Sequence, residues 1–320
     1  MALVFDQLRK RFGTVQALDG ISFTVEPGQV YGFLGANGAG KTTAMRIALD
    51  ILRADSGTVC WEGRESTELP RQTWGYLPEE RGLYPRMQIL DQLVFFGSLY
   101  GLTRSGARRE AQAWLARFRI PEYATRRADE LSKGNQQKVQ FIAAILHDPP
   151  VLIMDEPFTG LDPVNVALLK AAFLEMRDRG KTLVFSTHQM EMAEELCDAV
   201  AIIDHGRLVV SGPVREVKRA SGKQVVRLAV EGDPDMPWLG QLEGVTVIRP
   251  GRDYTELEVA AGGDPEVVLE AARTRGERIT LFEITDPSLE RIFVEQVGAA
   301  PPSLEERTLA APALSGAAQP

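Results

Sequence analysis

The sequence predicts an α/β protein with a mostly parallel sheet, an antiparallel β subdomain, a helical insertion and a smaller C-terminal α/β domain. Apolar runs at residues 151–154, 183–186 and 199–204 alternate with helical segments, which is typical of a parallel sheet. Apolar residues recur at helical spacing over residues 84–146, and this pattern indicates a helical insertion. A glycine-rich loop follows directly on the apolar run 30–34, as at the end of a buried strand.

The remaining elements follow in chain order. Short apolar runs broken by glycine and proline fill residues 3–34 and predict several strands, with further strands at 58–61 and 74–77. The second unit shows strand patterns, two helical segments and an Ala/Pro-rich end; its strands are expected at 224–230, 245–248, 255–259 and 279–284, and its helices at 265–274 and 287–296. We expect Asp286 to cap the last helix.

These patterns divide the chain into three parts. Residues 1–220 form the main domain, with its helical insertion at about 84–147, and residues 221–298 form the small C-terminal α/β domain. Residues 299–320 are predicted to be a disordered tail because they hold few large apolar groups.

Composition limits the kinds of partner and compartment. The 320 residues carry a net charge of −8, which does not favour nucleic acid as a partner. Cys60 and Cys197 lie far apart and suit a reducing compartment. The sequence shows neither a secretory signal pattern nor an apolar run of about 18 residues. We therefore expect a cytoplasmic chain that reaches a membrane only through a partner.

The glycine-rich loop predicts a phosphate site. Residues 35–42 read GANGAGKT, a full match to the phosphate-binding pattern G-x-x-x-x-G-K-[ST]. The glycines let the backbone curl so that successive N–H groups point at one anion. Lys41 can reach the terminal phosphates of a nucleotide, and Thr42 offers a hydroxyl to Mg²⁺. A helix expected over residues 42–52 would direct the positive end of its dipole at the phosphates.

A pair of carboxylates follows the apolar run at 151–154. Asp155 is expected at the C-terminal edge of a buried strand, beside the phosphate loop, where it can hold Mg²⁺ directly or through water. Glu156 is then suited to accept a proton from water attacking the γ-phosphate. Taken alone this pattern is weak, since strands often end in solvated acids; after a phosphate loop it is the expected metal-binding partner.

A second helix start carries polar residues. Residues 131–137 read LSKGNQQ, and Ser132 is expected to cap a helix that continues to Leu146. The N–H groups from Gly134 to Gln136 would form a second anion site. Without the other motifs, the same pattern describes only a capped helix.

With these motifs in this order, residues 1–220 resemble an ABC-type ATPase, the nucleotide-binding subunit of ATP-binding-cassette transporters, with its P-loop NTPase fold. Residues 35–42 match the Walker A loop and 151–156 the Walker B strand. Residues 131–136 resemble the signature loop, with Lys133 and Asn135 where the commonest version has glycine and glutamine. Residues 160–163 match the D-loop, and 186–188 match the switch segment.

The resemblance implies ATP and Mg²⁺ as cofactors and assigns roles to residues. The catalytic residues it implies are Lys41, Glu156 and His188. The residues it implies for nucleotide binding are Phe12, which stacks on adenine, Gly35, Asn37, Gly38, Ala39, Gly40, Lys41, Thr42, Thr43, Ser132, Gly134, Gln136, Asp162 and His188. The metal residues are Thr42, Asp155 and Glu79. Glu79 stands where the family has glutamine, so it adds negative charge near the γ-phosphate.

The resemblance also implies partners. In this family the phosphate loop of one subunit and the signature loop of another enclose each ATP, so we expect an ATP-driven dimer of identical or related chains. Residues 281–283 and 287–293 resemble the C-terminal domain of ABC-2-type exporter ATPases, and 75–85 and 132–138 resemble the sodium-exporter branch. An ABC-2-type membrane permease is the expected partner, docking near residues 84–96, and it would choose the cargo.

Two other functions stay open at this point. A soluble ABC ATPase of translation or DNA maintenance usually carries two cassettes or long coiled coils, whereas this chain has one cassette, no heptad run and an acidic balance. A catalytically silent regulatory subunit is disfavoured because Lys41, Asp155, Glu156 and His188 are all present.

Overall fold

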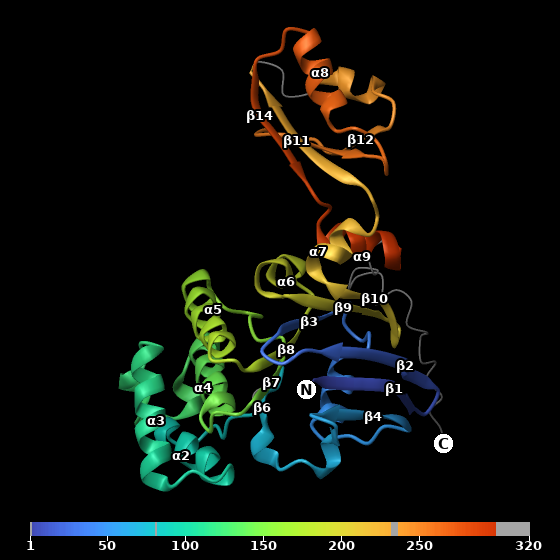
Figure 1. Ribbon diagram of the computed structural model, residues 1–320. Helices are drawn as coiled ribbons and strands as arrows, with labels where there is room; N and C mark the ends of the chain where they lie inside the picture. The colour runs from blue at the N-terminus through green and yellow to red at the C-terminus, as the bar shows by residue number, and fades with distance from the viewer. Residues whose placement is uncertain (1, 81, 232–235, 299–320) are drawn as a thin grey trace, which may run out of the picture.

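A mixed sheet forms the centre of the computed structural model, which describes residues 2–80, 82–231 and 236–298 (Figure 1). Its strands run in the order β10, β9, β3, β8, β7 and β6. Their bounds are β10 Arg207–Pro213, β9 Ala199–Asp204, β3 Val30–Leu34, β8 Thr182–Thr187, β7 Val151–Asp155 and β6 Trp74–Leu77. The strands from β9 to β6 are parallel and β10 is antiparallel, which confirms the mostly parallel sheet.

The register of this sheet fixes where the site lies. Leu34 pairs with Thr187, and Asp155 pairs with Ser186. The carboxyl ends of β3, β8 and β7 therefore meet at one edge, and the loops that follow them come together there. Every residue of these three strands is buried, because helices or a second sheet cover both faces.

The N-terminal strands form the expected antiparallel sheet, in the order β2, β1, β4 and β5. Their bounds are β2 Val15–Val25, β1 Leu3–Phe12, β4 Ser56–Trp61 and β5 Arg64–Glu65. Apolar residues of this sheet, of helix α1 (Lys41–Ala48) and of the central sheet share one core. That core holds the phosphate loop between two sheets.

Helices cover the other face of the central sheet and confirm the helical insertion (Figure 1). Their bounds are α2 Ile89–Leu99, α3 Arg104–Arg117, α4 Lys133–Ile145 and α5 Pro163–Asp178. Short 3₁₀ turns lie at Ser66–Glu68, Arg71–Thr73, Pro121–Tyr123, Ala128–Glu130 and Pro237–Gln241. None of the helices in the described ranges combines the length and the apolar character needed to span a membrane.

Helix α1 is shorter than the sequence predicts. It ends at Ala48, not at residue 52, because Asp50 adopts a left-handed φ of 53°. The N–H groups of Ile51 and Leu52 both turn back to the carbonyl of Arg46, at 2.9 and 3.1 Å. Such a closing turn satisfies the last helical carbonyls, so the apolar residues that follow leave the helix axis.

The C-terminal part has an antiparallel sheet in the order β12, β13, β11 and β14, with its own core under helix α8. The bounds are β11 Gln224–Val230, β12 Val245–Arg249, β13 Thr255–Val259, α8 Glu266–Thr274 and β14 Ile279–Thr285. Helices α6 (Met190–Leu196), α7 (Val214–Arg219) and α9 (Leu289–Val297) lie between this sheet and the central one (Figure 1). The boundary at residues 220/221 stays a prediction, and the expected tail 299–320 lies outside the described residues.

The cap assigned to Asp286 is wrong. Ser288 caps α9, since its hydroxyl accepts a hydrogen bond from the Arg291 N–H at 3.2 Å. Asp286 lies two residues before this cap and pairs instead with Arg219, at 3.2 Å. Asp and Ser have similar preferences for the N-cap position, so the sequence alone does not decide between Asp286 and Ser288. The helix begins at Leu289, which makes Ser288 the N-cap.

Candidate functional site

The phosphate loop packs so closely that two of its glycines admit no side chain. A Cβ atom on Gly35 would lie 2.4 Å from the carbonyl oxygen of Ile203, and one on Gly40 would lie 2.4 Å from that of Ala17. Their φ angles are 157° and 113°, which L side chains rarely adopt. The motif glycines are therefore required by the surrounding backbone as well as by a phosphate.

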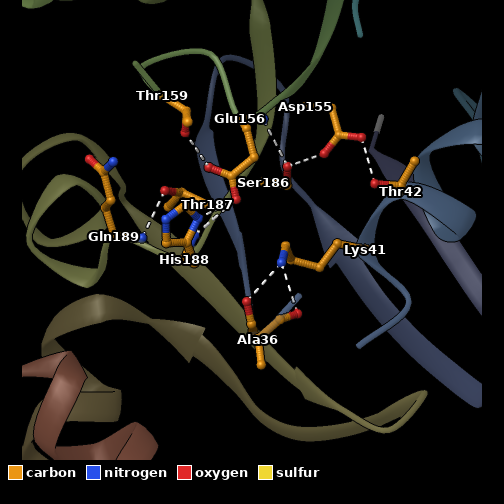
Figure 2. A network of polar contacts seen from close by, with 11 residues as sticks. Ala36, Lys41, Thr42, Asp155, Glu156, Thr159, Ser186, Thr187, His188 and Gln189 are labelled. Atoms are coloured by element: carbon orange, nitrogen blue, oxygen red, sulfur yellow. Dashed lines mark hydrogen bonds and ion pairs between the residues drawn. The ribbon is translucent and has the colours of Figure 1, made fainter. Parts of the chain in front are cut away.

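Lys41 is buried at the start of α1, and its Nζ donates to two carbonyl oxygens of the phosphate loop (Figure 2). The distances are 2.7 Å to Gly35 O and 3.1 Å to Ala36 O. Burial lowers the pKa of Lys41, while the carboxylates of Glu156, Asp155 and Glu79 oppose this by raising it. The loop thus presents a cation with nearby acidic groups and no side-chain anion bonded to it among the described residues.

Asp155 ends β7 and is almost fully buried, at 1% exposure. Its Oδ2 accepts a hydrogen bond from Thr42 Oγ1 at 2.6 Å, and its Oδ1 accepts one from Ser186 Oγ (Figure 2). Three oxygen-bearing side chains from β7, α1 and β8 therefore meet at one point. Oxygen donors of this kind suit a hard divalent cation.

Glu156 follows with a left-handed φ of 49°, which turns its carboxylate away from that of Asp155. Its N–H donates to Ser186 Oγ at 3.0 Å, and its Oε2 accepts from Thr159 Oγ1 at 2.9 Å. Its Oε1 accepts from the N–H of His188 at 3.1 Å and lies 2.8 Å from the Nδ1 of the same residue. The carboxylate is buried yet makes three polar contacts with Thr159 and His188, so it is held in one orientation.

A cleft of about 360 Å³ opens over these groups. It brings together the phosphate loop, the Walker B carboxylates and Glu79, and its lining is Val15, Ala17, Asn37, Gly38, Gly40, Lys41, Thr42, Thr43, Glu79, Asp155 and Glu156. His188 is not among these lining residues, but its N–H and ring contact Glu156, which is. Glu79, which the sequence predicts as a metal ligand, therefore faces the same cleft as Lys41.

Phe12 is not among the residues that line the cleft in the described structure, although its strand partner Val15 is. It ends β1, pairs with Val15 across the hairpin, and is 49% exposed. Lys10 Nζ lies 5.5 Å from its ring centroid. An exposed ring beside the cleft offers one free face to a planar group.

The signature-loop residues form a separate cluster outside the cleft. Ser132 caps α4 by accepting from the Asn135 N–H at 3.4 Å, as predicted. The amide of Gln136 turns inward and donates to Ala128 O at 2.7 Å. Asp162 caps α5. Within one chain these residues therefore do not meet the phosphate loop.

The sequence did not single out Thr159 or the strand residues Val15 and Ala17. Thr159 sits three residues after Glu156 and fixes its Oε2. The sequence marks Ser186 only as part of the switch segment, although its hydroxyl bonds both Asp155 and the Glu156 N–H. A polar residue closing an apolar strand next to the Walker B strand is the signal that could have found it.

Comparisons with known proteins agree with this geometry. Residues 18–159 match the family model described as ABC transporter, and residues 212–297 match the model described as ATP-binding protein DrrA1-3-like, C-terminal domain. An uncharacterized ABC transporter ATP-binding protein, YhaQ of Bacillus subtilis (strain 168), is 43% identical over 297 residues, covering 93% of this chain and 99% of the relative. The chain belongs to the ABC transporter ATP-binding proteins.

Two further matches agree with this family. The linearmycin resistance ATP-binding protein LnrL of the same Bacillus strain is 29% identical, covering 92% of this chain and 97% of the relative. A solved structure of the ATP-binding subunit of an ABC transporter superposes with a TM-score of 0.65 at 29% identity, covering 69% of this chain and 94% of that one. The predicted family, fold class and ATPase activity are confirmed, and the matches give no support to the two alternative functions.

Proposed function

We propose that this ABC ATPase powers export through a separate ABC-2-type membrane permease, on whose cytoplasmic side it sits, and that ATP joins it to a second cassette. One observation carries the proposal: three separated segments of the chain bring Lys41, Asp155 and Glu156 to the lining of a single cleft and place His188 against Glu156. Each has the burial and partners that its chemistry requires.

The phosphate loop would hold the triphosphate. The N-terminus of α1 has no side-chain cap among the described residues, so its N–H groups are available to phosphate oxygens. Lys41 would exchange the carbonyls of Gly35 and Ala36 for the β- and γ-phosphates, because an anion is a stronger partner for an ammonium group.

Thr42 and Asp155 would hold Mg²⁺, with Glu79 as a further oxygen donor at the rim of the cleft. Their hydroxyl and carboxylate oxygens, already 2.6 Å apart between Thr42 and Asp155, fit the ion's preference for oxygen ligands. When bound, Mg²⁺ would supply neutralisation of phosphate charge. Ser186 keeps Asp155 oriented through its second oxygen.

Glu156 would take the proton from the attacking water. Thr159 and His188 fix its two oxygens, so the carboxylate needs little reorganisation to act. The His188 side chain is half exposed beside Glu156, and we expect its ring also to reach the γ-phosphate or the water. Phosphoryl transfer depends mainly on such positioning and charge stabilisation.

A second cassette would complete the site. Ser132, Gly134 and Asp162 lie outside the cleft of their own chain, so they serve ATP only if another copy or a related chain presents them. Gln136 would join them only by giving up the bonds of its N–H to Ser132 O and of its side-chain amide to Ala128 O. Two helix N-termini from two subunits would then screen one triphosphate from both sides.

The exporter assignment draws on the relatives and on one surface. LnrL is named for resistance to linearmycin, and the DrrA-like C-terminal domain is shared by residues 212–297. On the helical insertion, the rings of Tyr84, Phe95 and Phe96 pack together with centroids 5.7–6.0 Å apart. Tyr84 is 52% exposed and Phe95 40% exposed, so this aromatic cluster offers the permease an apolar docking surface.

Replacing the base tests the proposal. We expect Glu156→Gln to slow ATP turnover by about 10²- to 10⁴-fold while ATP still binds, and to accumulate an ATP-bound dimer visible by size-exclusion chromatography with light scattering. Glu65→Gln, a matched change on the exposed strand β5, should behave as wild type. Full turnover in Glu156→Gln would remove Glu156 as the base, and co-purification with a permease tests the transport assignment.

A further inference from the structure

The last described helix of the chain packs on the helix that follows the switch histidine. Leu289, Ile292 and Phe293 of α9 share a core with Met190 and Ala193 of α6. Figure 1 shows α9 beside α7 at the base of the C-terminal sheet, next to α6. Helix α6 begins two residues after His188, so contacts that fix the position of α6 also restrict the position of that histidine.

Glu194 is the polar link in this contact. One of its oxygens accepts a hydrogen bond from the Leu289 N–H at the start of α9, and the other lies 2.8 Å from Lys218 Nζ on α7. The Glu194 side chain is 25% exposed, which makes these interactions stronger than those of a fully solvated pair. The positive end of the α9 dipole adds to the attraction.

The other face of α9 is tied to the C-terminal sheet. Arg291 and Glu295 of α9 interact with Glu258 of β13 and with Lys223, which precedes β11. The Arg291 Nε–Glu258 Oε2 distance is 2.8 Å, and the Lys223 Nζ–Glu295 Oε1 distance is 3.0 Å. A continuous set of contacts therefore runs from the sheet through α9 to Glu194.

The contact continues from α6 to the catalytic carboxylate. The N–H of Gln189 donates to Thr187 Oγ1 at 2.9 Å, which closes the turn between β8 and α6 (Figure 2). Within that turn, both the backbone and the ring of His188 meet Glu156 Oε1. His188 lies between the end of β8 and the start of α6. Because β8 is held in the central sheet, we expect the orientation of α6 relative to β8 to determine the position of His188.

We propose that Glu194 is a positioning residue for ATP hydrolysis: by anchoring α6 to α9 it keeps His188 against Glu156. The inference rests on the roles proposed above for His188 and Glu156. It assigns to the C-terminal domain an effect on turnover that does not require contact with nucleotide.

The test uses the full-length chain and steady-state hydrolysis of Mg·ATP. Glu194→Ala should lower kcat by about 3- to 30-fold and leave the KM for ATP within about twofold, since Lys41 and the phosphate loop are untouched. Glu194→Gln, which keeps an acceptor for the Leu289 N–H, should recover most of the loss. Glu290→Ala, the same change at an exposed site on the first turn of α9, should match wild type.

A second background shows whether the effect passes through His188. In His188→Ala, the further change Glu194→Ala should alter kcat little, because the positioned group is gone. Hydrogen exchange of residues 188–196 should be faster in Glu194→Ala than in Glu290→Ala. If Glu194→Ala does not fold, Lys218→Met, which removes the other partner of the same carboxylate, takes its place with a fall in kcat again expected.

The outcomes separate the two proposals. Wild-type kcat in His188→Ala would overturn the proposed role of His188 and this inference with it. A low kcat in His188→Ala together with wild-type kcat in folded Glu194→Ala would overturn the positioning role alone. An undiminished effect of Glu194→Ala in the His188→Ala background would likewise overturn it.

Discussion

Two helix N-termini of this chain are candidates to hold the phosphates of ATP, and they are built differently. Helix α1 follows Gly40, which has a left-handed φ and no side chain to cap the helix. Helix α4 follows Ser132, whose hydroxyl already accepts from the Asn135 N–H. The first opens into a cleft with a lysine and three carboxylates, whereas the second lies outside that cleft.

The difference shows that a helix N-terminus becomes a nucleotide site only through its surroundings. At α1, the strand ends of β3, β7 and β8 bring Lys41, Asp155 and Ser186 together within one chain. At α4, the neighbours are its own cap and the amide of Gln136, which bonds back to Ala128. On this comparison we expect α1 to be a complete half-site and α4 to need a triphosphate presented by another subunit.

The largest effect is expected at the complete half-site. Lys41→Ala should weaken ATP binding by about 10²- to 10³-fold and abolish measurable turnover, because it removes a buried cation from the phosphates. Binding is measured by fluorescence of a nucleotide analogue and by calorimetry. Lys181→Ala, which removes a partly buried cation paired with Asp148 away from the cleft, is the control. Intact affinity in Lys41→Ala would break the comparison.

A charge at the second N-terminus should separate binding from turnover. A Cβ at Gly134 would lie 2.9 Å from Asn165 Nδ2, and an aspartate there would also face the triphosphate of the partner cassette. Gly134→Asp should lower kcat by about 10²-fold through like-charge repulsion, with ATP affinity of the single chain changed little. Gly134→Ala separates the steric part from the charge. Normal ATP-driven dimerisation of Gly134→Asp would contradict the proposal that the N-terminus of α4 meets the ATP held by a partner subunit.

A smaller effect is expected at the aromatic beside the cleft. Phe12→Ala should weaken ATP binding by about 30-fold, which corresponds to about 2 kcal/mol, the middle of the range for stacking of a base on an aromatic ring. Phe12→Trp keeps a planar face and should bind nearly as wild type. The measurement is the dissociation constant for ATP against that for inorganic triphosphate, which lacks a base. An equal loss for both ligands would show that Phe12 does not stack on adenine.

The smallest effect concerns the carboxylate that replaces the family glutamine. Glu79→Gln should raise the Mg²⁺ concentration for half-maximal ATPase activity by about fivefold, as expected for losing about 1 kcal/mol of attraction from a solvated carboxylate. Glu80→Gln, at the adjacent exposed residue, is the matched control. An unchanged Mg²⁺ dependence would exclude Glu79 as a metal ligand, and unchanged coupling to a permease would remove it from the site.

Much of the site followed from sequence because local patterns specify it. The phosphate loop needs glycines and a lysine at fixed spacing, and an apolar run before Asp155 predicts its place at a strand end. Element ends were less predictable. Helix α1 stops at Ala48 because Asp50 turns left-handed, and the cap of α9 belongs to Ser288, not to Asp286. The end of α1 depends on the φ angle of one residue, Asp50. The cap of α9 depends on where the helix begins, because Asp and Ser have similar cap preferences.

By itself, the sequence determined the α/β class, the order of its motifs and the residues expected to meet phosphate, since hydrophobic period and loop composition are local properties. Only the tertiary structure decided that His188 bonds Glu156, that Ser186 joins Asp155 to Glu156, and that α9 returns to α6 through Glu194. These contacts join segments about 30 to 95 residues apart. Their formation depends on strand register and packed cores, which no local pattern encodes.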